Sequence, residues 1–307
     1  MYIIYIMSII GRLNSIKDLP TLPEVVFKVQ RMVFSDDGSA HGLAKLVEQD
    51  PSLAAKILQV ANSGLYASGA RITSVPTAIT RIGFNEIGQI VMAASVVKNF
   101  ARTSGLLDYK LFWRHALTAA HMAFTGSQIC RVGMSKEERD GLYLAGLLHD
   151  IGILIYDQFF HDEFEAIVDY AGGKGISYLE AESVIAPKET HAVLGAALLE
   201  MWKVGPSAIA GVRFHHTPDK APDKQKSISF IIHLSEYILC NSGLGSFEGL
   251  MRGQGGNILA QLNIDPDRLP AFLHDAQAEV DKSDLILAIE KPEPERSRGH
   301  DWLLRPV

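Results

Sequence analysis

Helix-starting and helix-ending residues punctuate this chain from Pro20 onward, and no long run of alternating apolar and polar residues predicts a strand. The dipeptide Asp50-Pro51 is typical of a helix start. The aspartate accepts hydrogen bonds from free backbone N–H groups, and proline has no N–H to leave unpaired. This punctuation predicts an all-α fold.

The same reasoning gives approximate helix ranges. Helices are predicted over residues 23–33, 40–48, 51–62, 76–83, 85–102, 109–131, 141–160 (with Asp140 as its cap), 162–171, from Ser177 onward, 191–202, 206–216, 224–241 and 267–282. The glycines at 172, 173 and 175 are expected to end the helix before them, and Thr190 to cap the helix after it. Residues 247–262 are glycine-rich, which predicts a loop that leads into a short helix, and the Pro- and Arg-rich tail from Lys291 is expected to be disordered.

Charge and composition narrow the classes of function. The net charge is −6 and no block of Lys or Arg is present, so we expect no nucleic-acid partner. The helices on either side of Gly83 could be read as a helix-turn-helix, but they carry little that could contact a base. Cys130 and Cys240 stand in apolar segments, as is common in a reducing cytoplasm. The apolar stretch at residues 1–10 is too short for a bilayer and has no basic leader, so a cytoplasmic protein without membrane contact is expected.

An imidazole and a carboxylate, His149 and Asp150, stand side by side within the apolar run from Leu144 to Leu154. Burying such groups is costly unless they are paired or bind a metal. On one helix these neighbours would point about 100° apart, so a shared target would have to lie against the helix wall. A His-Asp hydrogen bond that only fixes packing is the simpler alternative.

Further candidate ligands follow the same pattern, each on a different predicted helix. In chain order they are His115, His149, Asp150, His191, His215, His216 and Glu236. Imidazole and carboxylate sets of this kind suit iron, manganese or zinc rather than calcium. We therefore expect a transition metal bound by these residues, with room for two ions, and no organic cofactor.

The order His115, His149-Asp150, Glu236 resembles the HD superfamily of metal-dependent phosphohydrolases, with glutamate in place of the last aspartate. His191 and the pair His215-His216 are similar to the extra ligands of the HD-GYP branch, which hydrolyses cyclic di-GMP. That branch has His-Asp-Ile-Gly-Lys where this chain has Ile153 in the last position, and its Gly-Tyr-Pro segment is missing after the paired histidines.

The closer resemblance is to the HDOD family, the HD-related output domains of bacterial signalling proteins. Three motifs carry it: Leu-Pro-Thr-Leu-Pro-Glu-Val at 19–25, Asp-Pro-Ser-Leu-Ala-Ala-Lys-Ile-Leu-Gln-Val-Ala-Asn-Ser at 50–63, and Ile-Thr-Arg-Ile-Gly at 79–83. The resemblance implies an N-terminal helical subdomain packed on an HD-type helical domain. The expected divisions are a segment at 1–15, the N-terminal half at 16–104, the HD-like half with the metal site at 105–245, an extension at 246–290 and the tail at 291–307.

Two functions are compatible with these residues. The resemblance implies a regulatory signalling protein with little or no catalysis. We expect it to contact a signalling partner in trans and to hold a bound metal, with iron or manganese favoured over zinc. The alternative is a metal-dependent phosphohydrolase acting on a nucleotide or cyclic dinucleotide, with Asp150 as a catalytic residue that bridges two ions.

Overall fold

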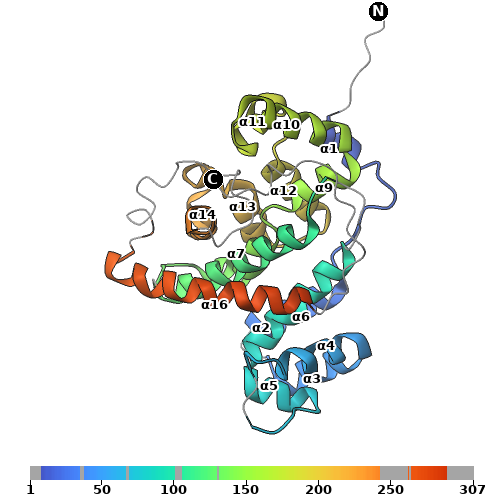
Figure 1. Ribbon diagram of the computed structural model, residues 1–307, viewed down its shortest axis with the longest axis vertical. Coiled ribbons are helices and arrows are strands. Elements are labelled where there is room, and N and C mark those ends of the chain that lie inside the picture. Colours follow the sequence, from blue (N-terminus) through green and yellow to red (C-terminus); the bar gives the residue numbers. More distant parts are fainter. Residues whose placement is uncertain are drawn as a thin grey trace, which may run out of the picture. The chain divides into compact units, whose positions relative to one another are not determined.

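The computed structural model describes residues 8–34, 38–66, 69–100, 106–129, 131–242, 262 and 264–288. Within these ranges the secondary structure is entirely helical, which confirms the all-α prediction (Figure 1). None of the helices in these ranges combines the length and the apolarity needed to cross a bilayer.

Most of the helices in the described ranges are short. The α-helices are α1 (Ile9–Leu13), α2 (Glu24–Phe34), α3 (Ala40–Glu48), α4 (Pro51–Ala61), α5 (Val75–Ile82), α6 (Phe84–Asn99), α7 (Tyr109–Ile129), α8 (Lys136–Leu148), α9 (Ile151–Phe159), α10 (His161–Lys174), α11 (Tyr178–Ile185), α12 (His191–Met201), α13 (Pro206–Phe214), α14 (Lys226–Ser242) and α16 (Leu269–Ala288). Short 3-10 helices cover Pro218–Lys220, Asp223–Gln225 and Pro266–Arg268.

The helices divide into two compact units, of which one contains residues 21–100 and 274–288 of the described chain. In this unit α2 packs on α6, and α5 packs on both α3 and α4. Asp50 caps α4 as predicted, since its Oδ1 accepts from the backbone N–H groups of Ser52 and Leu53 at 2.9 and 3.2 Å. Asn62 ends α4 and exchanges two hydrogen bonds of 2.8 Å with the backbone of Ile72, which fixes the loop that leads to α5.

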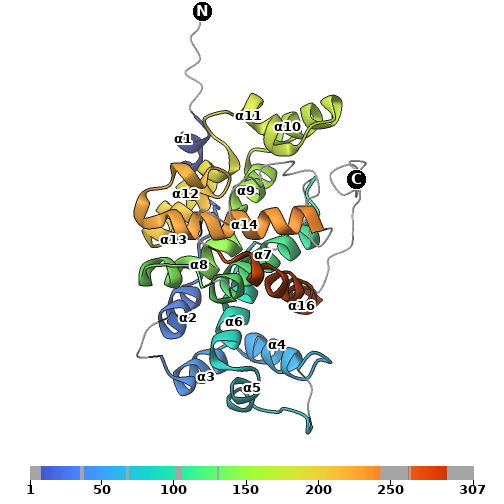
Figure 2. The same cartoon turned by 90° about the vertical axis from the view of Figure 1, so that its left-hand side faces the viewer.

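The other unit contains residues 8–20, 106–242 and 262–273 of the described chain. Here α8 packs against α7 and α13, α12 packs against α9 and α13, and α14 lies along α7. Helices α10 and α11 pair with each other beside α9, as Figures 1 and 2 show. All the candidate ligands are in this unit.

The predicted helix at 141–160 is wrong, because the chain forms two helices there. Helix α8 begins at Lys136, where Ser135 and Glu138 form a capping box: the Glu138 N–H donates to Ser135 Oγ, and the Ser135 N–H donates to the Glu138 carboxylate. Helix α8 ends at Leu148, and α9 begins at Ile151. His149 and Asp150 therefore occupy the junction between two helices rather than adjacent positions on one.

Several other helix ends and caps differ from the predictions, among them the end of α16, which is Ala288 rather than Lys282. Helix α6 begins at Phe84 rather than Asn85, directly after Gly83, whose φ is 106°. Helix α10 continues through the first two glycines to Lys174, because a glycine inside a helix costs only about 1 kcal/mol; it ends at Gly175, which has the left-handed φ of 63°. The side chain of Thr190 does not cap α12. The predicted loop at 247–262, except Leu262, and the tail from Lys291 lie outside the described residues.

Candidate metal centre

The seven candidate ligands come together from five places in the fold. His115 is in the middle of α7, His149 and Asp150 join α8 to α9, and His191 is the first residue of α12. His215 and His216 follow α13, and Glu236 is on α14. Six of them are buried, and the seventh, His216, is partly buried with a side chain that is 9% exposed.

Two glycines allow these helices to approach closely enough. A Cβ on Gly146 of α8 would lie 2.7 Å from the Ala120 Cα of α7, and a Cβ on Gly152 of α9 would lie 2.0 Å from the His191 carbonyl oxygen of α12. The Cβ of any larger residue at these positions would clash with the backbone of the neighbouring helix. The glycines therefore set the distances from the junction after α8 to His115 and to His191.

The carboxylate of Asp150 is at the centre of the cluster, and each of its oxygens faces two imidazoles. Oδ2 lies 3.4 Å from His115 Nε2 and 3.2 Å from His149 Nε2. Oδ1 lies 3.4 Å from His191 Nε2 and 3.5 Å from His215 Nε2. No hydrogen-bond donor in the described residues is aligned with either oxygen, although both are buried. A carboxylate in this arrangement can bridge two cations.

Three of the rings are held so that Nε2 faces inward. The Nδ1 atom of His149 hydrogen-bonds to the Gly146 carbonyl at 2.7 Å, and that of His215 to the Val212 carbonyl at 2.6 Å. The third, His191 Nδ1, hydrogen-bonds to Glu182 Oε2 at 2.7 Å. A neutral imidazole that donates from Nδ1 carries its lone pair on Nε2, which is the usual state of a metal-ligating histidine.

The inward nitrogens are close to one another. The Nε2 atoms of His115 and His149 are 3.2 Å apart, those of His191 and His215 are 3.3 Å apart, and those of His191 and His216 are 2.9 Å apart. Lone pairs that face each other at these distances repel unless a proton or a cation lies between them. The ring positions thus create two places that attract positive charge.

Glu236 adds a second buried carboxylate to this arrangement. Its Oε2 lies 3.9 Å from His215 Nε2 and 3.7 Å from His216 Nδ1, and no hydrogen-bond donor in the described residues reaches either of its oxygens. Burial and the nearby charge of Asp150 raise the pKa of Glu236 to about 8. A carboxylate in this position needs either a proton or a cation.

The ring pKa values show the same demand for positive charge. Burial lowers the pKa of His149, but Asp150 more than offsets it and raises the value to about 9. Burial likewise lowers the pKa of His191, which Glu182 and Asp150 raise to about 10. Burial lowers the pKa of His215 to about 4. Without a metal, protons on His149 and His191 would therefore balance the charge of the carboxylates at neutral pH.

The cluster offers two sets of four ligands that share Asp150. One set is His115, His149, Asp150 and Glu236, and the other is Asp150, His191, His215 and His216. Within each set the ligand atoms lie within 4.8 Å of one another. The orphaned carboxylate oxygens and the converging nitrogens fit a transition metal.

Sequence reasoning missed Glu182, which orients His191 from the neighbouring helix α11. Its Oε1 accepts from the His191 backbone N–H at 2.6 Å, while its Oε2 binds the ring. Glu182 is completely buried and lies four residues after the buried Tyr178, on the same face of α11. A glutamate on the apolar face of a helix was the available signal, since it requires a partner.

The family is now clear from a comparison with known domains. The HDOD domain model matches residues 19–218, well over half of the chain. The chain belongs to the HDOD family. The match confirms the resemblance of the three N-terminal motifs, and it includes every candidate ligand of this HDOD protein except Glu236.

Solved structures share the fold of this HDOD protein. A protein of unknown function from Geobacter sulfurreducens, described as an HDOD domain protein, matches with a TM-score of 0.72 and 24% identity over 91% of this chain and 95% of that one. A candidate signal transduction protein from Marinobacter aquaeolei VT8 matches with a TM-score of 0.68 and 23% identity over 89% and 59% of the two chains. A candidate phosphohydrolase from Shewanella amazonensis SB2B matches with a TM-score of 0.67 and 20% identity over 90% and 97%.

A curated protein from Treponema pallidum (strain Nichols), described as uncharacterized, is 22% identical over 220 residues. The match takes in 70% of this chain but 41% of that protein, so the chain spans about two fifths of the length of this relative. Identities this low show the fold alone, and the function has to be argued from the centre itself.

Proposed function

We propose that this HDOD protein is a regulatory protein of bacterial signal transduction that acts through protein contacts, and that its buried centre binds metal for stability rather than for catalysis. The first metal position would use His115, His149, Asp150 and Glu236, and the second would use Asp150, His191, His215 and His216. Histidine and carboxylate ligands favour iron or manganese here, with zinc as a further candidate.

The closure of the centre is the observation that carries this proposal. Apart from His216, every ligand side chain is at most 1% exposed. Structural zinc sites are closed by four protein ligands, whereas catalytic zinc sites keep one position open for water or substrate. Each position here has four protein ligands and lies in the core, so a substrate would have to displace buried side chains to reach the ion.

The lack of a cation beside the centre supports the same conclusion. Ile153, which stands where the HD-GYP motif has lysine, is 1% exposed and belongs to the core of α9. No Lys or Arg forms an ion pair with Asp150 or Glu236 among the residues that the structure describes. A phosphodiester bound here would lack the positive side chain that stabilises its charge.

A metal-dependent phosphohydrolase is the second candidate, and the division of the Asp150 oxygens between two ligand pairs favours it. A carboxylate shared between two ions is a feature of phosphate-hydrolysing metal centres, where the ions supply Lewis acidity. In this reading Asp150 would be essential for turnover, and the closed ligand shell would have to open.

Metal analysis combined with a turnover assay separates these functions. Protein purified without chelator is expected to contain at least one equivalent of iron or manganese. Asp150→Ala should lower both metal content and melting temperature, because an ion that binds only the folded state stabilises it by mass action. The exposed Asp219→Ala is the matched control and should change neither.

Reconstituted wild-type protein should hydrolyse cyclic di-GMP far below ordinary enzyme rates, which are of order one per second or more. If the wild type turns over cyclic di-GMP at such a rate and Asp150→Ala abolishes this turnover, the protein is a phosphohydrolase instead. A protein without metal, whose melting temperature Asp150→Ala leaves unchanged, would show that the histidines are separate core residues.

A further inference from the structure

The three histidines whose Nδ1 atoms are held differ in what holds them. His149 and His215 each bond to a carbonyl three residues earlier, Gly146 and Val212, so the end of each ring's own helix orients it. His191 depends instead on Glu182, a side chain of another helix. Orientation of His191 therefore requires α11 to be in place.

Glu182 makes this dependence strong because it binds His191 twice. One oxygen accepts from the His191 backbone N–H at 2.6 Å, which caps the first turn of α12, and the other accepts from Nδ1 at 2.7 Å. Thr190, at the N-cap position, makes no such bond with its side chain. A charged acceptor also makes Nε2 a better electron donor to a metal. Glu182 thus fixes both the start of α12 and the ligand at that point.

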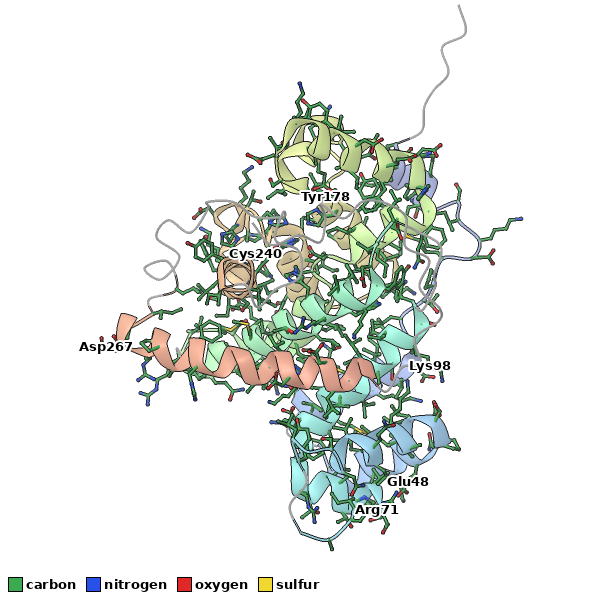
Figure 3. All side chains as sticks on the ribbon, in the orientation of Figure 1. Glu48, Arg71, Lys98, Tyr178, Cys240 and Asp267 are labelled. Atoms are coloured by element: carbon green, nitrogen blue, oxygen red, sulfur yellow. The ribbon has the colours of Figure 1, made fainter. Side chains whose placement is uncertain are left out.

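Helix α11 is itself a short surface element. Tyr178, labelled in Figure 3, lies at its buried start, where its ring centroid is 6.1 Å from that of His191 and 6.0 Å from that of Phe164 on α10. At the other end of the helix Val184 and Ile185 are 56% and 41% exposed. Because α11 is only eight residues long and packs mainly on α10, undocking it would disrupt few contacts in the rest of the unit.

We propose that Glu182 is a positioning residue that makes the second metal position conditional on α11: metal at His191, His215 and His216 binds only when α11 is docked, and its binding holds α11 in place. The first position, whose ligands need no contact from α11, is independent of this helix. The inference rests on the proposed metal centre, and it adds a link between metal occupancy and the surface of the protein. Such a link is reciprocal, because two events that favour the same state stabilise each other equally.

Glu182→Gln is the test variant, since it preserves the size of the side chain. One carboxylate oxygen becomes an NH₂ group, which would face an N–H donor of His191 instead of accepting from it. Loss of such an outer contact typically weakens metal affinity about 10- to 100-fold. Glu165→Gln, on the exposed side of α10, removes the same charge without touching the centre and is the matched control.

Manganese titration with elemental analysis gives the first readout. Wild type and Glu165→Gln are expected to hold two Mn²⁺ per chain, and Glu182→Gln to retain one with unchanged affinity while the second weakens about 10- to 100-fold. Hydrogen exchange gives the second readout and needs no variant: exchange of residues 178–190 should slow when wild type is loaded with Mn²⁺. This metal-dependent slowing should disappear in Glu182→Gln, while circular dichroism confirms that the variant is folded.

The failures of the two proposals are distinct. A wild type that binds neither manganese nor iron overturns the metal centre itself. If the wild type binds manganese and Glu182→Gln binds the same number of ions with the same affinity, the proposed role of Glu182 is overturned. If manganese loading leaves hydrogen exchange at residues 178–190 unchanged in wild type, the link to α11 is overturned, even if metal binds.

Discussion

Replacing Gly152 with alanine would separate α9 from α12 at the point where the proposed metal ligands meet. The new Cβ would lie 2.0 Å from the His191 carbonyl oxygen, 2.7 Å from its carbon and 2.8 Å from its Cα. All three atoms are backbone, so no side-chain rotation relieves the contact. Ordinary contact begins at 3.4 Å, and the two helices must therefore move apart by 3.4 − 2.0 = 1.4 Å.

Two opposing effects set the size of the change. Overpacking of this kind costs about 1–3 kcal/mol, while alanine in place of glycine in a helix gains at most about 1 kcal/mol. The metal adds a further loss, because ligand distances must stay within about 0.2 Å of their ideal values. If metal at about 100 times its Kd stabilises the wild type, losing it costs roughly another 2.7 kcal/mol.

Thermal unfolding with and without chelator measures both contributions. Gly152→Ala should lower the melting temperature in chelator by about 2–4 °C for each kcal/mol, and more strongly in manganese, with metal content reduced. Gly173→Ala on α10 is the matched control, since an added Cβ there would meet no described atom within 4 Å beyond its chain neighbours and the adjacent backbone of its own helix. That change should be neutral or stabilise by about 0.5–1 kcal/mol.

Equal destabilisation of Gly152→Ala in metal and in chelator would show that the clash does not reach the centre. Full metal content together with an unchanged melting temperature would refute the reasoning, because the backbone contact would then have been relieved without moving His191.

Two further predictions concern the same unit. His115→Ala should remove a ligand and lower metal content. His121→Ala, six residues along α7, should retain the metal but lower the free energy of unfolding by about 1–3 kcal/mol, because His121 Nε2 hydrogen-bonds Tyr143 Oη at 3.2 Å. Equal metal loss in both variants would contradict the assigned ligand set. Burial raises the pKa of Asp157 although its Oδ1 accepts from the Leu106 N–H. A raised folded-state pKa contributes stability at low pH that is lost as pH rises through that pKa. The stability of Asp157→Asn relative to wild type should therefore be greatest at pH 7 and decrease towards pH 4. Chemical denaturation at several pH values measures this difference in stability, and a difference that does not change with pH would contradict the assignment.

The all-α fold and most helix boundaries follow from local sequence. Asp50-Pro51 and the capping box of Ser177 with Glu180 act on the turn that contains them, so their effect is readable without tertiary contacts. The capping box at Ser135 was equally local, and the incorrect start at Gly141 came from overlooking it. The ligand types were also readable, because buried histidines and carboxylates require partners wherever they lie.

Only the tertiary structure decided how these groups meet. No proline or glycine separates Leu148 from Ile151, and the helix break there places Asp150 between ligands from α7, α12 and α13. Glu182 and His191 are nine residues apart on different helices, and no spacing rule predicts that one orients the other. Local preferences specify where helices begin and end, whereas contacts between helices depend on packing. At Gly152 a hydrogen atom in place of a methyl group lets α9 approach α12, and this sets the distance from Asp150 to His191.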